Sequence, residues 1–329
     1  MQNIAIGTLG GTIAMVSEEG AGGKPSLGAR DLVAAVPELD GLGEFVLENL
    51  AQLPSASLSF MDLLAAFQWA EAQIEAGAQA VILTQGTDTI EETAFFFHLY
   101  WKKQAPLIIT GAMRMPFARG ADGPANLLAA VRVACSPLSA QSGVLVVLNE
   151  TIHSPYWIQK TDSSAVETFR SPQMGPLGRV IEDRVVYFHT KRFGGHFLSL
   201  PMCLDHKIAL YSTALAAGAD HLKLILEAGL YQGVVISGFG AGHLSFAEAE
   251  VAKAYATSLP IIMATRCQTG ETARATYGYN GSEMDLLQAG VMMAGFLSPL
   301  KARLLLWALK GAPKTLGSFS AHWHEWTLA

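Results

Sequence analysis

The sequence predicts an α/β protein with two domains, on the basis of its length, its apolar patterning and a break in that patterning. At 329 residues the chain is long for a single hydrophobic core. Short apolar runs alternate with helical patterns in the first half, which indicates a parallel sheet with helices on both faces. A second alternation begins after residue 206. We therefore expect a larger N-terminal three-layer domain with a parallel sheet and a smaller, flavodoxin-like α/β C-terminal domain.

In the first domain, each expected strand is a short apolar run and each expected helix has apolar residues at helical spacing. The strands are expected at 3–8, 44–50, 79–84, 106–110 and 143–149. The helices are expected at 29–36, 60–76, 90–103 and 123–135. Three acidic residues are placed to start helices, as N-caps or in the first turn: Asp62, Glu92 and Asp122. The run Phe95–Phe97 is interpreted as helix core.

The segment 150–206 breaks this rhythm and is rich in Pro, His, Ser and aromatic residues. We interpret it as a functional loop followed by a linker. Beyond it, strands are expected from 208, at 233–237 and at 260–264, and helices at 216–229, 245–257 and 298–310. The predicted domains are therefore 1–185 and 207–329, joined by a linker at 186–206.

Two glycine turns that carry threonine follow expected strands of the first domain. The turn Gly10–Thr12 follows an apolar run that ends at Ile6, and the turn Gly86–Asp88 follows one that ends at Leu83. Open α/β sheets hold their ligands at the carboxyl ends of their strands, so we expect both turns at one site. Two hydroxyls, one carboxylate and sterically open backbone N–H groups suit nucleophilic attack on a small polar substrate.

These turns and further motifs along nearly the whole chain resemble the bacterial-type L-asparaginase family. The motifs are Leu9–Ala14, Thr84–Thr89, Thr110–Arg114, Ala121–Leu127, Lys160–Thr161 and Pro299–Arg303. The resemblance implies hydrolysis of asparagine to aspartate and ammonia, with glutamine as a weaker substrate and without a metal or cofactor. It also implies a homotetramer, built as a dimer of intimate dimers.

The same resemblance implies roles for individual residues. Thr12 corresponds to the primary nucleophile, and Thr87, Asp88 and Lys160 correspond to the second catalytic group. Ser55 corresponds to the ligand of the substrate α-carboxylate, with Ser57 as the alternative, and Asp88 would also pair with the substrate ammonium.

The rest of the expected site consists of backbone groups and two distant side chains. Gly11, Gly86 and Ala112 are expected to bind substrate, and Ala112 and Thr87 are the expected sources of oxyanion N–H groups. His243 and Glu283 correspond to residues that reach into the site of the neighbouring subunit. Arg114 and Asp122 are expected to form a structural pair that supports the site.

Four positions depart from the family pattern. Leu9 replaces a Thr, Gln85 replaces a His, and His243 replaces an Asn. The segment 17–28, expected to be flexible, lacks the tyrosine that hydrogen-bonds the nucleophile in many relatives. The first two departures bear on rate and subgroup, the third on substrate preference or pH response, and the fourth on how the nucleophile is activated.

Composition argues against several other classes of protein. A net charge of −6 and the lack of a basic run give no footprint for nucleic acid. No window approaches 18 uninterrupted apolar residues, so we expect no membrane span. The N-terminus has no basic segment before its apolar run, and Cys135, Cys203 and Cys267 form no CxxC pair. These features favour a cytoplasmic protein.

Particular motifs of the chain suggest other functions. Gly238–His243 invites a dinucleotide site, but the fingerprint requires Gly at position 243. His322 and His324 could bind a metal, but no third ligand is apparent. A related amidohydrolase with another primary target stays open, as does a non-catalytic amino-acid-binding protein that keeps the fold. The catalytic hypothesis is favoured because Thr12, Thr87, Asp88 and Lys160 are all present.

Overall fold

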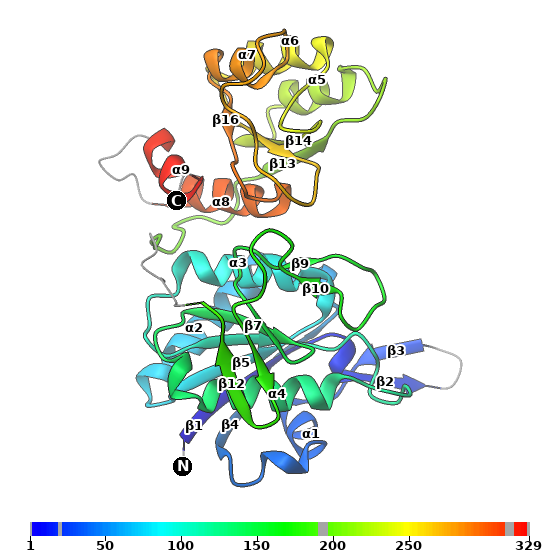
Figure 1. The fold of residues 1–329 in the computed structure, drawn as a ribbon, viewed down its shortest axis with the longest axis vertical. Coiled ribbons are helices and arrows are strands. Elements are labelled where there is room, and N and C mark those ends of the chain that lie inside the picture. Colours follow the sequence, from blue (N-terminus) through cyan, green and yellow to red (C-terminus); the bar gives the residue numbers. More distant parts are fainter. Residues whose placement is uncertain (1, 19–21, 190–196, 313–318, 328–329) are drawn as a thin grey trace. The chain divides into compact units, whose positions relative to one another are not determined.

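The computed structural model describes residues 2–18, 22–189, 197–312 and 319–327. The chain divides into two compact units, Met1–Phe197 and Leu198–Ala329. Each unit has its own sheet and its own helices (Figure 1). Of the expected linker 186–206, residues 190–196 lie outside the described part of the chain.

The first unit is built on an eight-stranded sheet. Its strand order is β12-β11-β8-β7-β6-β5-β1-β4. Five of the strands are parallel and correspond to the expected runs: β1 (Gln2–Gly10), β4 (Gly43–Leu53), β5 (Ala80–Thr84), β6 (Leu107–Thr110) and β7 (Val144–Leu148). Strands β5, β6 and β7 are buried along their whole length, as their continuous apolar runs predict. The expected larger α/β domain with a mainly parallel sheet is confirmed.

Helices cover both faces of this sheet. Ile4, Ile6, Ile82 and Ile108 face one side, where they form a core with α1 (Ala29–Ala34) and α4 (Gly123–Cys135). Alternate residues face the other side, which carries α2 (Phe60–Glu75) and α3 (Ile90–Tyr100) (Figure 1). The run Phe95–Phe97 is fully buried there, so its assignment to helix core is confirmed.

The expected acidic residues start their helices in different ways. Asp62 forms a capping box with Ser59 at the start of α2, and Glu92 lies in the first turn of α3. Asp122 is the residue before α4, but its carboxylate makes no capping hydrogen bond. That carboxylate binds backbone N–H groups of another turn, described below.

The segment 150–206 contains strands that the sequence analysis did not predict. β8 (Thr151–His153), β11 (Gly178–Ile181) and β12 (Arg184–Tyr187) extend the sheet with antiparallel pairing beyond β7. A short pair, β9 (Gln159–Lys160) and β10 (Phe169–Arg170), lies between β8 and β11 in the chain. Strands of two to four residues carry little periodicity. Pairing beyond β7 in the main sheet stabilises β8, β11 and β12, whereas β9 and β10 pair with each other in a separate sheet.

The second unit has a parallel four-stranded sheet, with its strands in chain order: β13 (Ile208–Ser212), β14 (Gly233–Gly238), β15 (Ile261–Thr265) and β16 (Met292–Met293). Its helices are α5 (Asp220–Glu227), α6 (Phe246–Tyr255), α7 (Glu283–Gln288), α8 (Pro299–Gly311) and α9 (Phe319–Thr327). The expected smaller α/β domain is confirmed. Helices α7 and α9 and strand β16 were not predicted.

The helix expected at 216–229 is wrong at its start. Ala216 and Gly218 have φ angles of 58° and 71°, and α5 begins only at Asp220. A left-handed backbone cannot continue a right-handed helix, so the chain turns at residues 215–216 and stays irregular up to the start of α5.

Candidate active site

The two glycine turns lie against each other at the carboxyl ends of β1 and β5. These strands pair in parallel, with Thr8 opposite Thr84. Gly11 has a φ of 83°, and a Cβ atom at this position would lie 2.0 Å from the backbone nitrogen of Gly86. Only glycine allows so close an approach. Thr12 and Thr87 are therefore each one residue away from the same backbone contact.

The side chain of Lys160 lies at this place, brought from β9 of the segment 150–206. Its Nζ donates to Thr87 Oγ1 at 3.0 Å and to Asp88 Oδ1 at 2.7 Å. Thr87 is buried and the Lys160 side chain is 15% exposed, whereas the Asp88 side chain is 68% exposed. The carboxylate therefore holds the ammonium from the solvent side. The structure thus brings together three of the four expected catalytic side chains through hydrogen bonds.

Ser55 adjoins the second glycine turn. It begins a short 3-10 turn, Ser55–Ser57, after β4. A Cβ atom on Gly86 would lie 2.8 Å from Ser55 Oγ. Among the residues described, this buried hydroxyl has no hydrogen-bond partner, while Ser57 is exposed. A buried hydroxyl normally finds a partner, which makes Ser55 better suited than Ser57 to bind a ligand at this turn.

A third turn follows β6. Asp122 accepts hydrogen bonds from the backbone N–H groups of Met113 at 2.9 Å and Arg114 at 2.8 Å. The Arg114 guanidinium instead donates to the Gly120 carbonyl at 3.1 Å. The expected Arg114–Asp122 pair therefore exists through the backbone of Arg114 and not through its charge. A Cβ atom on Gly111 would lie 2.5 Å from the Gln85 carbonyl, so this turn packs against the one after β5.

Open backbone N–H groups accompany these three turns. Gly11, Gly86 and Ala112 are buried, and within the described ranges their N–H groups have no hydrogen-bond partner. Buried N–H groups are almost always paired, so unpaired ones at one sheet edge indicate a place for an acceptor. An oxyanion is such an acceptor.

Two of the departures from the family pattern are packing positions. Leu9 is buried in β1, and Gln85 is fully buried. Gln85 Nε2 lies 3.3 Å from the Gly86 carbonyl and 3.4 Å from Thr89 Oγ1, and Thr89 Oγ1 donates to the Ser55 carbonyl at 3.2 Å. Gln85 and Thr89 thus connect the turn after β5 to the turn that carries Ser55.

The segment after Thr12 forms a hairpin in its described part. β2 (Met15–Glu18) pairs with β3 (Gly22–Pro25), and the chain then returns to Ala14, whose carbonyl accepts from Ser26 and Leu27 (Figure 1). The segment 17–28, expected to be flexible, includes residues 19–21, which lie outside the described ranges.

His243 and Glu283 contact each other in the second unit, with His243 Nε2 3.1 Å from Glu283 Oε2. The other oxygen of Glu283 accepts from the Thr276 and Tyr277 N–H groups, both at 2.6 Å. Burial raises the pKa of Glu283, but these N–H groups and His243 outweigh it and hold the pKa below its usual value. The rings of Tyr277 and Tyr279 lie edge-on to His243. The two residues expected to act together therefore form one cluster.

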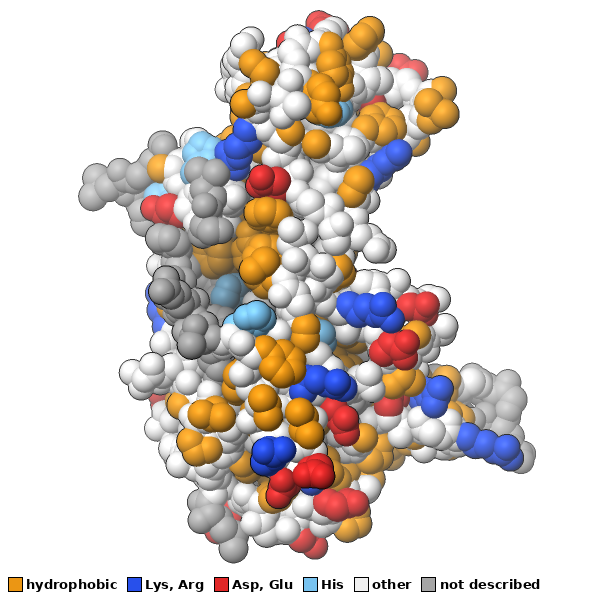
Figure 2. Space-filling model, in the orientation of Figure 1, with side chains coloured by type: hydrophobic (Ala, Val, Ile, Leu, Met, Phe, Trp, Pro, Cys, Tyr) orange, Lys and Arg blue, Asp and Glu red, His pale blue; other side chains and the backbone are white. Residues whose placement is uncertain are grey.

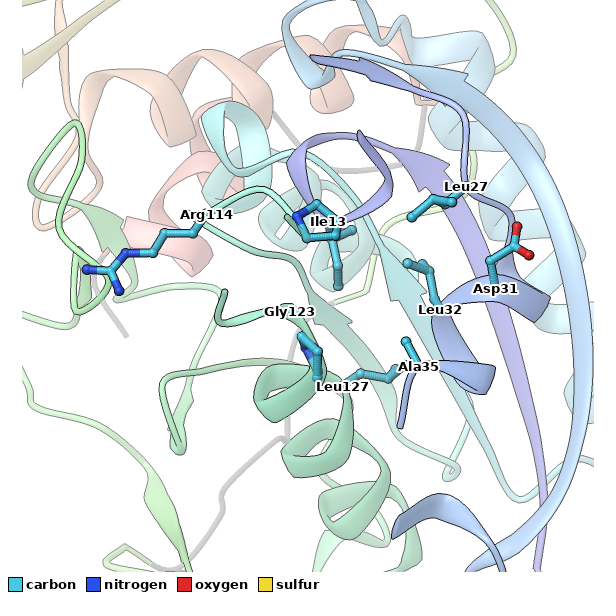
Figure 3. A pocket seen from close by; sticks show the side chains of 10 residues that line it. Ile13, Leu27, Asp31, Leu32, Ala35, Arg114, Gly123 and Leu127 are labelled. Atoms are coloured by element: carbon cyan, nitrogen blue, oxygen red, sulfur yellow. The ribbon is translucent and has the colours of Figure 1, made fainter. Parts of the chain in front are cut away.

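A small pocket lies behind the first turn. It is lined by Ile13, by Leu32 of α1 and by Leu127 of α4, which are labelled in Figure 3. Its volume is about 40 Å³. Its walls are mainly hydrocarbon, and Thr87, Asp88 and Lys160 do not line it. The pocket therefore belongs to the packing that anchors Ile13, the neighbour of Thr12 in the chain.

Other kinds of site gain no support from the described part of the chain. No cluster of three or more His, Cys, Asp or Glu side chains is arranged to hold a metal ion among the residues described. In the same residues, no helix combines the length and apolar character needed to cross a membrane. Figure 2 shows acidic and basic side chains interspersed on one face.

Sequence reasoning assigned no role to two residues that organise the site. Thr89 is the last residue of the second signature, and Asn126 lies in the motif Ala121–Leu127. Both are buried or half-buried polar side chains that hydrogen-bond strand-end turns. For Asn126 the sequence contained a signal: a polar residue stands among the core-facing positions of an expected helix, beside Leu127.

Comparison with known proteins places this geometry in a family. The profile described as "Asparaginase, N-terminal" matches residues 3–193, and "Glutaminase/Asparaginase C-terminal domain" matches 207–317. The chain is 32% identical to the probable periplasmic L-asparaginase of Haemophilus influenzae and 31% identical to L-asparaginase 2 of Escherichia coli. Each match covers 93% of this chain and 88% of the relative.

Solved structures agree with the sequence comparison. The crystal structure of a probable cytoplasmic L-asparaginase from Campylobacter jejuni matches with a TM-score of 0.87 and 27% identity. The match covers 99% of this chain and all of that one. Both domain profiles and full-length relatives thus agree with the fold and the turns described above: the chain belongs to the asparaginase family.

Proposed function

We propose that this protein hydrolyses L-asparagine to L-aspartate and ammonia through a threonine nucleophile, with glutamine as a weaker substrate. The observation that carries the proposal is the contact of Gly11 with Gly86, next to Lys160 bound to Thr87 and Asp88. The relatives named above are described as L-asparaginases. This arrangement places two threonine turns, an amine and a carboxylate at one sheet edge.

The proposed reaction has two steps. In the first, the Thr12 hydroxyl attacks the carboxamide carbon, its proton is transferred to the leaving nitrogen, and ammonia departs from an acyl-enzyme. In the second, water attacks the ester, which releases aspartate and restores the hydroxyl. Open N–H groups at the turns stabilise the oxyanion, and a donor of this kind contributes about 10²–10³ in kcat. Thr87, Asp88 and Lys160 form the group that accepts and returns the proton.

Substrate recognition is proposed to use the edges of the same site. Ser55 binds the α-carboxylate, and the exposed Asp88 carboxylate pairs with the substrate ammonium. Side chains and backbone groups supply all of this chemistry. We further propose a cytoplasmic homotetramer in which His243 and Glu283 complete the site of a neighbouring subunit.

The direct test follows ammonia release from L-asparagine, L-glutamine, D-asparagine and a β-aspartyl peptide. The highest kcat/KM is expected for L-asparagine. Thr12→Ala, Thr87→Ala and Lys160→Met are each expected to lower kcat by several orders of magnitude, with unchanged circular dichroism. Thr12→Ser serves as the matched control, because it keeps a hydroxyl, and is expected to retain measurable activity.

Three outcomes would contradict the proposal. Near-normal turnover in Thr12→Ala would remove that residue as nucleophile. Binding of an amino acid without ammonia release from any substrate would favour a non-catalytic binding protein. A higher kcat/KM for another amide would identify a related amidohydrolase.

A further inference from the structure

Asp122 and Asn126 hold the turn after β6 from one side. Asp122 Oδ2 accepts from the Met113 N–H at 2.9 Å, and Asn126 Nδ2 donates to the Gly111 carbonyl at 3.0 Å. The two side chains also hydrogen-bond each other, at 3.1 Å between Asn126 Nδ2 and Asp122 Oδ2. Both are more than nine-tenths buried. We call this pair the Asp122–Asn126 clamp.

The Asn126 side chain is held in one orientation, because both the nitrogen and the oxygen of its amide are hydrogen-bonded. Asn126 Oδ1 accepts from the backbone N–H of Asn149 at 2.8 Å, just after β7. The single side chain therefore connects the ends of β6 and β7 with the first turn of α4. Buried polar groups that are fully paired in this way rigidify their surroundings.

Two of these hydrogen bonds, from Asn126 to the Gly111 carbonyl and from the Met113 N–H to Asp122, fix the two peptide units that flank Ala112. No peptide bond in the described residues is cis, and in a trans peptide the N–H points opposite to the C=O. Since Asn126 binds the Gly111 carbonyl, the Ala112 N–H points away from Asn126. Since Asp122 binds the Met113 N–H, the Ala112 carbonyl points away from Asp122.

Ala112 is fully buried, yet both of its backbone groups are open. Neither its N–H nor its C=O has a hydrogen-bond partner among the residues that the structure describes. Such groups are costly to bury unpaired, so they indicate a ligand that offers an acceptor and a donor. A carboxamide offers both, whereas the carboxylate of the product offers acceptors only.

We propose that Asn126, together with Asp122, is a positioning residue that aims the backbone groups of Ala112 at the carboxamide of the substrate. This inference rests on the proposed function. Asn126 does not touch the reacting atoms; it acts through the Gly111–Ala112 peptide. The donor and acceptor are set before substrate arrives, so no reorganisation is needed in the transition state.

The test compares kcat and KM for L-asparagine in three variants. Asn126→Ala removes the bond to Gly111 and is expected to lower kcat at least about tenfold, since a lost oxyanion donor costs about 10²–10³. KM is expected to rise by a smaller factor than kcat falls, because the same groups bind the carboxamide of the substrate less strongly than the transition state. Thr110→Val is the matched control. It removes a buried hydrogen bond to the Val147 carbonyl in the same sheet, at 2.7 Å, without touching either peptide of Ala112. Its kcat is expected to be unchanged.

Asn126→Asp supplies a pH signature that a purely structural role would not give. Its carboxylate would face the Gly111 carbonyl and the Asp122 carboxylate, and the neighbouring charge raises the pKa of the new group. Below that pKa the protonated acid can again donate. The ratio of variant to wild-type kcat is therefore expected to rise as pH falls from 8 to 6.

Hydrogen–deuterium exchange in the segment 111–116 provides a readout independent of activity. Asn126→Ala is expected to accelerate exchange there, whereas Thr110→Val is not. An active wild type with unchanged kcat in Asn126→Ala, or equal losses in Asn126→Ala and Thr110→Val, overturns the inference alone. A wild type that releases no ammonia overturns the proposed function and the catalytic part of the inference, and unchanged exchange overturns the clamp itself.

Discussion

At the scale of single residues, the site depends on polar groups whose partners come from distant parts of the chain. Lys160 reaches Thr87 and Asp88 across more than 70 positions of sequence. A lone lysine in a loop is ordinarily a solvated charge, and an exposed pair adds little to stability. Here the Lys160 side chain is mostly buried and its ammonium donates to the Thr87 hydroxyl. Its position is therefore determined by the site.

The two serines of the 3-10 turn give a matched pair of variants. Ser55→Ala is expected to raise KM for L-asparagine at least about tenfold, because a hydrogen bond to a charged group contributes about 1.5–3 kcal/mol. Ser57→Ala, on the exposed side of the same turn, is expected to leave KM unchanged. Steady-state kinetics of ammonia release measure both. The reverse pattern would make Ser57 the carboxylate ligand.

His153 predicts a pH dependence of stability. Burial lowers the pKa of His153 to about 4, from an ordinary value of 6.5. The unfolded chain therefore binds the proton more readily, and stability is lost as pH falls from 6.5 toward 4. The difference between the two pKa values corresponds to a loss of at most about 3 kcal/mol in the free energy of unfolding.

This loss can be assigned to His153 by substitution. Urea unfolding at pH 7 and pH 5 is expected to show a smaller drop in the free energy of unfolding for His153→Gln than for wild type. His189 is exposed, so His189→Gln serves as the control and should keep the wild-type drop. Equal drops in all three proteins would refute the assignment.

At the scale of elements, the decisive features are the turns that end parallel strands. Gly10 and Gly11 both have positive φ, and Gly11 has no room for a side chain against Gly86. The turn packs on its other side through Ile13, which contacts α1 and α4. The glycines therefore allow the turn after β1 to approach the turn after β5, and the apolar contacts of Ile13 hold it in place.

Gly11→Ala is expected to abolish activity and to destabilise the protein. The substitution adds left-handed strain of roughly 1–2 kcal/mol and a clash with the Gly86 backbone. Gly22→Ala is the matched control, because Gly22 has a φ of 72° with open space around it. It should show the strain alone. Thermal unfolding and ammonia release together separate the two effects, and equal behaviour would contradict the backbone contact.

In helix α4, one substitution is expected to lower stability without removing a residue of the proposed active site. Leu127 is 1% exposed and lines the pocket beside Ile13. Leu127→Ala is expected to cost about 2–5 kcal/mol in the free energy of unfolding, because it enlarges that pocket. Leu138→Ala, at an exposed position, is the control and should cost much less. Urea unfolding measures both variants. Similar losses in the free energy of unfolding would show that neighbouring side chains move to fill the enlarged pocket.

At the scale of the whole molecule, the proposed assembly has a clear signature. Light scattering is expected to give four times the chain mass of 35.1 kDa. If His243 and Glu283 complete a neighbouring site, His243→Ala should lower kcat/KM while the mass stays that of a tetramer. His221→Ala is the control in the same unit. An active monomer would contradict the intersubunit role.

The sequence by itself determined the fold class, the five parallel strands, most helices and the family motifs. These features are local: continuous apolar runs become buried strands, and glycine turns end them. Leu83 and Gly86 could be placed in this way without any tertiary information.

The tertiary structure decided what depends on contacts between distant segments. The short strands of 150–206 form by pairing, three of them in the main sheet beyond β7 and two with each other, and their sequences show no periodicity. Three features follow from which backbone lies beside which side chain: the burial of Ser55 while Ser57 is exposed, the hydrogen bonds of Gln85 and the clamp on Ala112. The spacing of residues along the chain does not show which turns will be neighbours. Hydrogen bonds between turns form only when the strands that carry these turns are packed together.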